Sequence, residues 1–188
     1  MFSKKVILGS SSPRRMQLIQ ELGFEVEIRK KEVDENHPDS MSLYDVPEYL
    51  SKLKAEPLKE TLQENEVLIT SDTVVIFNGR ILGKPKNREE AIETLKELSG
   101  KEHDVVSGVY IYTPHQEKSF SEKTTVYFKV LSQEEIEYYV DQYQPFDKAG
   151  AYGIQEWIGM IGVKKIVGDF YNVMGLPVQR LWDALSHL

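Results

Sequence analysis

The chain has 188 residues, of which 40% are hydrophobic and 28% are charged, and its formal net charge is −7. This length favours a single domain over residues 1–188. The acidic balance argues against a nucleic-acid-binding protein, which usually carries a basic surface, and the absence of cysteine excludes disulfides, thiolate metal sites and a cysteine nucleophile.

The lengths of the apolar runs indicate where the protein is located, and the spacing of the histidines indicates which metals it could bind. No apolar run approaches the roughly 18–20 residues that span a bilayer, and residues 6–8 are too few for a signal peptide. We therefore expect a cytoplasmic protein with no membrane partner. The four histidines show no metal-ligand spacing, so a metal would have to be a hard cation held by carboxylates.

The first predicted elements are a buried strand over residues 6–8 and a helix over 13–22. Ser12 is a favourable N-cap, and Pro13 is favourable at the first helical position. Gly23 is well suited to follow the end of this helix.

Two arginines follow this helix start. Arg14 and Arg15 fall in the first turn, where the helix dipole disfavours cations. One explanation is a bound anion, such as a phosphate, seated at the helix N-terminus beside the small-residue turn that contains Ser10. The alternative is that both arginines point into water.

A strand over 24–28 and a polar loop over 30–42 come next. Loops of about a dozen residues in a compact domain are often functional. This loop carries Asp34 and Glu35, which could serve a metal site or could be plain solvated charge.

A helix is predicted to begin at Asp45, with Glu48 three residues later. Pro57 should end or kink it. Lys54 lies on this helix and could either contribute to a site or extend from its apolar edge into water.

The sequence TVVIFNGRIL predicts a β-hairpin with its turn at Asn78 and Gly79. Counting outward pairs Phe77 with Arg80, Val75 with Leu82, and Thr73 with Lys84. Strict alternation then places Asp72 and Lys84 on opposite faces, so a twist is needed for them to share a site. The alternative for Asp72 is a turn-capping role before the strand.

The remaining residues alternate between helices and strands without a regular βαβ rhythm, which favours a mixed α/β sheet over a doubly wound one. The expected segments are helices over 88–98, 132–140 and 177–188, strands over 105–112, 124–130 and 161–167, a glycine-rich loop over 147–155 and a loop over 168–176.

Several enzyme classes lack their motif in this sequence. LGKP is not a Walker A loop, no GxGxxG follows the first strand, and no serine lies in a GxSxG elbow. A P-loop ATPase, a dinucleotide dehydrogenase and a serine hydrolase are therefore disfavoured. The cationic groups and carboxylates at element ends are consistent with metal-assisted attack of water on a phosphoryl group.

Eight motifs occur in the order found in one family: SSSPRR, VDE, LKA, SDTVV, LGKP, LSGKEHDVVSGV, DKAGAYGIQ and NVMGLPV. The chain resembles the Maf family, also called septum formation inhibitors, over about residues 6–185. The family acts as nucleoside triphosphate pyrophosphatases. YQPFDKAG and the bulky Trp157 depart from the family's usual pattern.

The resemblance implies a fold like that of the inosine triphosphate pyrophosphatases, with a bent mixed sheet, flanking helices and a cleft between two lobes. It implies a homodimer and a divalent cation, Mg²⁺ or Mn²⁺. Asp72 matches the family's catalytic acidic residue, described as the proton acceptor. Arg14, Thr73 and Gln155 match the positions that mark a dTTP/UTP-type subgroup.

Together the residues and the resemblance predict the site. Glu35 and Asp72 would hold the metal, Asp72 would activate water at the α-phosphorus, and Lys84 would assist. The predicted substrate-binding residues are Ser10, Arg14, Arg15, Lys54, Thr73 and Gln155.

Two alternatives stay open. One is a pyrophosphatase of the same fold for non-standard purine or 7-methylguanosine triphosphates. The other is a non-catalytic regulator of cell division, which would show no metal-dependent turnover and would expose a large apolar patch.

Overall fold

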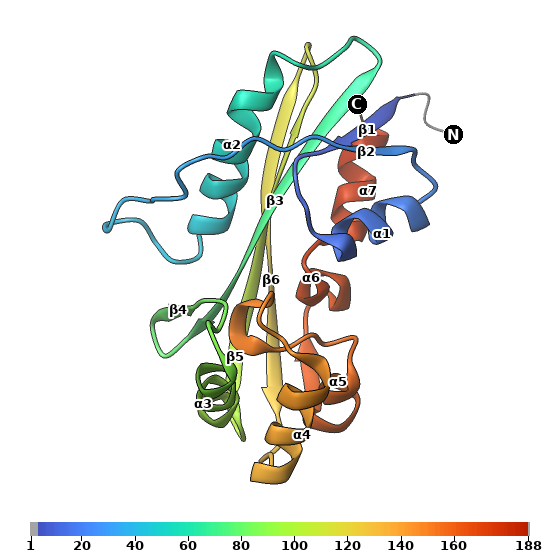
Figure 1. Ribbon diagram of the computed structural model, residues 1–188. Helices are drawn as coiled ribbons and strands as arrows, with labels where there is room; N and C mark the ends of the chain where they lie inside the picture. Colours follow the sequence, from blue (N-terminus) through green and yellow to red (C-terminus); the bar gives the residue numbers. More distant parts are fainter. Residues whose placement is uncertain (1–3, 188) are drawn as a thin grey trace. The chain divides into compact units, whose positions relative to one another are not determined.

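The computed structural model describes residues 4–187, which form two compact units (Figure 1). Among these residues, unit 1 comprises 4–73, 107–122 and 175–187, and unit 2 comprises 74–106 and 123–174. No helix within 4–187 combines the length and the apolar character needed to cross a membrane.

The elements follow one another in mixed order along the chain. They are β1 (Lys5–Leu8), α1 (Pro13–Glu21), β2 (Val26–Ile28), α2 (Val46–Lys59), β3 (Glu66–Phe77), β4 (Arg80–Leu82), α3 (Arg88–Leu98), β5 (Glu102–Tyr112), β6 (Glu117–Phe128), α4 (Gln133–Tyr143), the 3-10 helix η1 (Ala149–Ala151), α5 (Trp157–Gly162), β7 (Val163–Val167), α6 (Phe170–Met174) and α7 (Val178–Ser186).

The strands form one mixed sheet of order β2-β1-β3-β5-β6-β7, in which β4 pairs with β3. β1 is parallel to both β2 and β3, whereas the β3–β4 and β6–β7 pairs are antiparallel. The predicted mixed α/β class is therefore confirmed.

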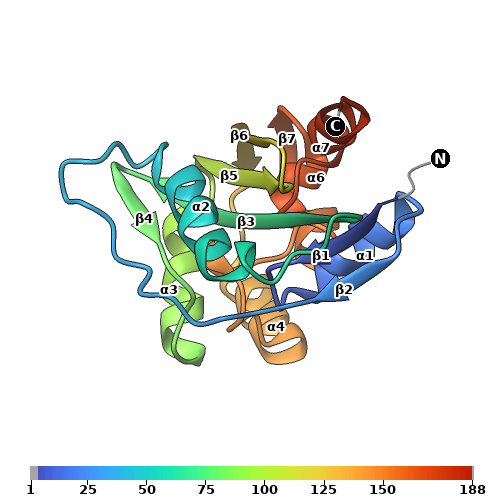
Figure 2. The same cartoon turned by 90° about the horizontal axis from the view of Figure 1, so that it is seen from above.

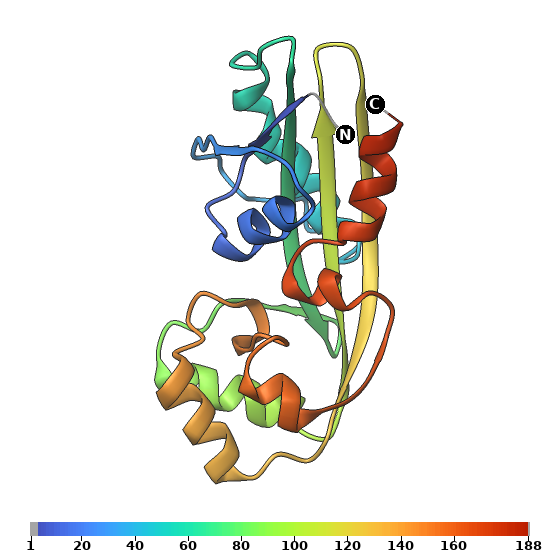
Figure 3. The same cartoon turned by 90° about the vertical axis from the view of Figure 1, so that its right-hand side faces the viewer.

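In unit 1, helices cover both faces of the sheet. Ser119 and Ser121 of β6 donate to the Glu48 carboxylate of α2. Lys118 and Phe120, which point the other way by strand alternation, contact α7. Thus α2 and α7 lie on opposite sides of the 117–122 part of β6 (Figure 3). Helix α1 lies beside β2 (Figure 2).

Unit 2 has its own apolar core. Helices α3 and α4 lie side by side (Figure 3) and bury Leu95 and Tyr139, neither of which is exposed to solvent. Phe77 from β3 and Phe128 from β6 belong to the same cluster. Burying apolar area of this kind is the main favourable term in folding.

The local signals for helix starts and for the hairpin are confirmed. Ser12 and Asn87 each accept a backbone N–H bond as the N-caps of α1 and α3, and Ser132 forms a complete capping box with Glu135. The hairpin pairs Phe77 with Arg80 and Val75 with Leu82, as predicted. The ladder does not include the predicted Thr73–Lys84 pair, because β4 ends at Leu82.

The other corrections have local causes. α2 continues through Pro57 to Lys59, because Ala55 and Leu58 in its last turns are buried in the core of unit 1. The 168–176 segment contains α6, whose N-terminal N–H groups bond to the side chain of Asp169.

The strands also differ in extent from their predicted ranges. β3 begins at Glu66, β5 at Glu102 and β6 at Glu117, each earlier than expected. β7 is shorter than predicted because Ile161 belongs to α5. The predicted last residue of the C-terminal helix, Leu188, lies outside the described residues, and α7 ends at Ser186.

Candidate active site

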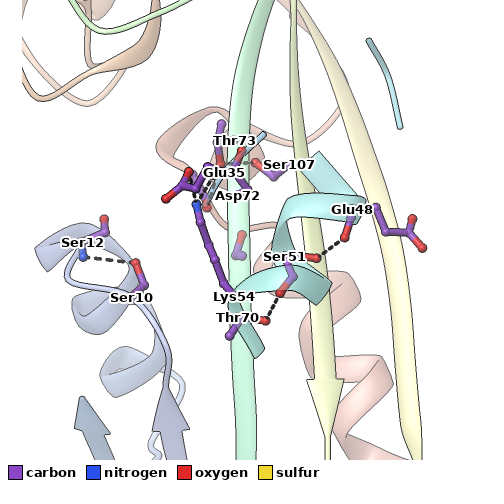
Figure 4. A network of polar contacts seen from close by, with 12 residues as sticks. Ser10, Ser12, Glu35, Glu48, Ser51, Lys54, Thr70, Asp72, Thr73 and Ser107 are labelled. Carbon is purple, nitrogen blue, oxygen red and sulfur yellow. Dashed lines mark hydrogen bonds and ion pairs between the residues drawn. The ribbon is translucent and has the colours of Figure 1, made fainter. Parts of the chain in front are cut away.

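The turn between β1 and α1 is held against the sheet. The Gly9 N–H bonds to the Ile69 carbonyl at 2.8 Å. A Cβ at Gly9 would lie 2.5 Å from the Thr70 side chain, so this close approach requires glycine. The Ser10 hydroxyl next to it accepts from the Ser12 N–H at 3.2 Å and thereby shapes the helix start (Figure 4).

Arg15 binds the protein rather than facing water. Its Nε donates to the Gly175 carbonyl at 2.8 Å, and Nη1 donates to the Ser71 carbonyl at 2.8 Å and to the Ser10 hydroxyl at 3.2 Å. Its Nη2 donates to Thr73 Oγ1 at 2.9 Å. Neutral oxygens of the protein thus satisfy four of the five N–H groups of Arg15.

The Thr73 hydroxyl belongs to the same network. It lies 2.8 Å from the Ser107 hydroxyl and 3.3 Å from the Gly175 carbonyl. Ser10, Arg15 and Thr73, which the sequence predicted to bind substrate, are thus held together mainly by one another and by backbone carbonyls.

Lys54 of α2 bridges two carboxylates. Its Nζ lies 2.5 Å from Asp72 Oδ1 and 3.0 Å from Glu35 Oε2 (Figure 4). The Asp72 and Lys54 side chains are largely buried, at 14% and 18% exposed, whereas Glu35 on the loop is 55% exposed. We call Glu35, Lys54 and Asp72 the carboxylate–lysine cluster.

Asp72 lies in the middle of β3 and is not a turn-capping residue before a strand. Asp72 and Thr73 are half-buried, while the other positions of β3 are buried. Strand alternation sends their side chains to opposite faces, so Asp72 meets α2 and Thr73 meets Arg15. The central strand of the sheet therefore carries two adjacent polar networks.

The charges of the two networks act on one another. Burial has the largest effect on the pKa of Arg15 and lowers it. The charges have smaller effects, in decreasing order: Asp72 raises the pKa, Arg14 lowers it and Glu35 raises it. Arg15 remains a cation because arginine is not deprotonated in proteins. Four predicted site residues thus share one electrostatic neighbourhood in unit 1.

Lys84 and Gln155 lie in unit 2, and both are exposed. Lys84 follows the end of β4, and Gln155 lies between η1 and α5. The predicted assistance of Lys84 to Asp72 stays a prediction.

Within residues 4–187, no group of three or more histidine, aspartate or glutamate side chains could hold a metal ion by itself. Glu35 and Asp72 supply two carboxylates in contact with one ammonium group. Such a pair suits Mg²⁺, which is commonly bound by one or two carboxylates together with waters and substrate phosphates.

The sequence analysis did not assign roles to three residues around the Gln155 loop. Lys148 is buried and its Nζ lies 2.7 Å from Asp147 and 3.2 Å from Glu156. The Tyr139 hydroxyl donates to Glu156 and accepts from the Gly153 N–H. The motif DKAGAYGIQ indicated that this loop is functional. Tyr139 lies before the motif, in α4, and no pattern in the sequence indicated a role for it.

A mixed α/β fold that presents arginines, a lysine and carboxylates on and beside its central strand has the features of an enzyme that acts on an anionic substrate. A sequence model of the family described as Maf-like protein matches residues 5–188, and the chain belongs to that family.

Two relatives are similar over nearly their whole length, and both are named dTTP/UTP pyrophosphatase. The protein from Bacteroides thetaiotaomicron is 51% identical over 98% of this chain and 96% of its own. The protein from Porphyromonas gingivalis is 48% identical over 97% of this chain and 93% of its own.

Among solved structures, a HAM1 protein from Coxiella burnetii superposes with a TM-score of 0.51 at 13% identity. The match covers 98% of this chain and 100% of that chain. At this identity the likeness concerns the fold alone.

Proposed function

We propose that this chain hydrolyses dTTP and UTP to the nucleoside monophosphate and pyrophosphate. The names of the relatives at 51% and 48% identity support this activity. The observation that carries the proposal is the carboxylate–lysine cluster, in which a half-buried carboxylate on the central strand contacts a cation. Hydrolysis of an anhydride needs both a group that activates water and positive charge at the phosphates.

In this proposal Asp72 orients the attacking water at the α-phosphorus and accepts its proton. Lys54, Lys84 and Arg14 supply positive charge to the triphosphate. Arg15 has a structural role, because it donates hydrogen bonds to Ser10 and Thr73 and thereby holds both side chains in place. Oriented cations of this kind stabilise the charge that develops during phosphoryl transfer.

A divalent cation is part of the proposal. Glu35 and Asp72 would hold Mg²⁺ or Mn²⁺, and the ion would polarise a phosphoryl oxygen. Lys54 contacts the same two carboxylates and balances part of their charge.

Gln155 is proposed to read the base. Its amide has both donors and an acceptor, which suits the edge of a pyrimidine. The second polar contact predicted for Thr73 would require its hydroxyl to exchange one of its present partners, Arg15, Ser107 or Gly175.

The test is a panel of UTP, dTTP, CTP, GTP, ITP and 7-methyl-GTP, with and without Mg²⁺ or Mn²⁺, analysed for pyrophosphate and monophosphate. We expect metal-dependent release of pyrophosphate, fastest from UTP and dTTP. Preference for ITP or 7-methyl-GTP would favour the same-fold alternative, and absence of turnover would favour a non-catalytic division regulator.

The homodimer and the cytoplasmic location implied by the resemblance and the composition belong to the same proposal. Sedimentation velocity at micromolar protein should give the mass of two chains. A single-chain mass would contradict the dimer and leave the catalytic assignment standing.

A further inference from the structure

The loop that carries Gln155 is fixed more tightly than an ordinary surface loop. Gln155 is exposed, but its neighbour Ile154 is buried in the core of unit 2. Ala151 has φ +60, a region that non-glycine residues rarely adopt, although its side chain is fully buried. Strained backbone of this kind persists only where the surroundings over-determine it.

Three side chains hold the loop after this strained residue. The hydroxyl of Tyr139, a fully buried residue of α4, accepts from the Gly153 N–H at 3.0 Å and donates to Glu156. The Glu156 carboxylate also contacts the buried Lys148 ammonium at 3.2 Å. One phenol therefore anchors the residues on both sides of the Ile154–Gln155 pair.

The protonation of this phenol suits its role. Burial, and after it the hydrogen bond to Glu156, raises the pKa of Tyr139, so the hydroxyl keeps its proton and stays a donor. The hydrogen bond to Glu156 is partly buried and charge-assisted, and bonds of this kind are both strong and directional.

The packing at Gly153 leaves little freedom beside the Gln155 amide. A Cβ at Gly153 would lie 2.9 Å from the Glu156 carboxylate carbon and 3.1 Å from Gln155 Nε2. The amide of Gln155 and the carboxylate of Glu156 thus both lie against the Gly153 backbone, and this backbone is the group that Tyr139 holds.

We propose that Tyr139, Glu156 and Lys148 are positioning residues that fix the orientation of Gln155 and so set the base selectivity of the site. This inference rests on the proposed function, in which Gln155 reads the base. It adds residues that do not touch the substrate but determine how the reading residue is presented.

The test compares the ratio of kcat/KM for UTP to that for GTP across four proteins: wild type, Tyr139→Phe, Gln155→Ala and the double variant. Tyr139→Phe keeps the buried ring and removes only the hydroxyl. We expect Tyr139→Phe to lower the ratio roughly tenfold, because a tenfold change corresponds to about 1.4 kcal/mol, which is within the range that one intramolecular hydrogen bond contributes. In the Gln155→Ala background it should lower the ratio no further, because coupled residues do not act additively.

Tyr110→Phe is the matched control. Tyr110 is also fully buried and its hydroxyl donates to a carboxylate, that of Glu117, but both residues lie in unit 1, outside the Gln155 loop. This variant should lower the thermal unfolding midpoint and leave the ratio unchanged. Glu156→Gln provides a second test. The amide oxygen of the variant can still accept from Tyr139, but the charge that faces Lys148 is lost. The UTP-to-GTP ratio of this variant should therefore fall less than that of Tyr139→Phe.

The outcomes separate the two proposals. A changed ratio in Gln155→Ala with an unchanged ratio in both Tyr139→Phe and Glu156→Gln would overturn the inference alone. An unchanged ratio in Gln155→Ala would overturn base reading by Gln155 and the inference with it. An equal change in Tyr110→Phe would assign the effect to lost stability and would also overturn the inference.

Discussion

Arg14 and Arg15 are neighbours in the first turn of α1. Arg15 makes four hydrogen bonds to oxygens from the 9–12 turn, β3 and the residue Gly175. Arg14 enters the same neighbourhood through its charge on Arg15. The sequence correctly predicted that both arginines lie in the first helical turn. It did not predict the hydrogen bonds of Arg15, because most of its partners are distant in sequence.

These contacts give a prediction. Arg15→Ala leaves several partly buried acceptors without donors and should lower the free energy of unfolding by about 2–3 kcal/mol. Arg14→Ala removes a charge that the proposed function assigns to the triphosphate and should raise the KM for UTP. Urea unfolding of Arg15→Ala and steady-state kinetics of Arg14→Ala check this; an Arg15→Ala variant as stable as wild type would contradict the structural role of Arg15.

The buried His103 predicts a pH dependence of stability. Burial lowers its pKa from 6.5 to about 4, so the folded state keeps it neutral at a pH where the unfolded chain is already protonated. The contribution is complete above pH 6.5 and is lost as the pH falls from 6.5 towards 4. At about 1.4 kcal/mol per pH unit, roughly 3 kcal/mol is lost across this range.

Urea unfolding at pH 7.5, 5.5 and 4.5 measures this loss. His103→Phe should flatten the decline, because the side chain no longer titrates. The idea fails if the wild type and His103→Phe lose stability in parallel.

At the scale of elements, helix starts were the most predictable features. Ser12, Asn87 and Ser132 act locally, within three residues, so the sequence contains the whole interaction. The Asn78–Gly79 turn is local in the same way. Strand extents were less predictable: β6 begins with polar residues whose partners, Glu48 and α7, are supplied by other elements.

The caps give a third stability prediction. Ser132→Ala removes the acceptor for the Glu135 N–H and should cost about 1 kcal/mol. Asp45→Ala should cost less, because Asp45 makes no side-chain cap bond to α2. Thermal unfolding of the two variants compares them, and a larger loss for Asp45→Ala would contradict the assignment of the caps.

At the scale of the whole molecule, the pattern of elements predicted the mixed sheet, and the ordered motifs predicted the family. The pairing of Lys54 with both Glu35 and Asp72 was not predictable, because it joins a loop, a helix and a strand that are separate in sequence. The hydrogen bond from the Gly153 N–H to the Tyr139 hydroxyl was not predictable for the same reason, because α4 and the loop at Gly153 meet only in the folded chain.

The central proposal is that the carboxylate of Asp72 on β3, which is paired with Lys54, activates the attacking water as a general base. The most direct measurement is the kcat for UTP hydrolysis of Asp72→Asn beside Asp45→Asn, with the thermal unfolding midpoint of each. Loss of a general base typically costs about 10²–10⁴-fold, so Asp72→Asn should lose turnover by that factor while it stays folded and Asp45→Asn keeps its activity. Turnover of a folded Asp72→Asn close to that of wild type would contradict the account.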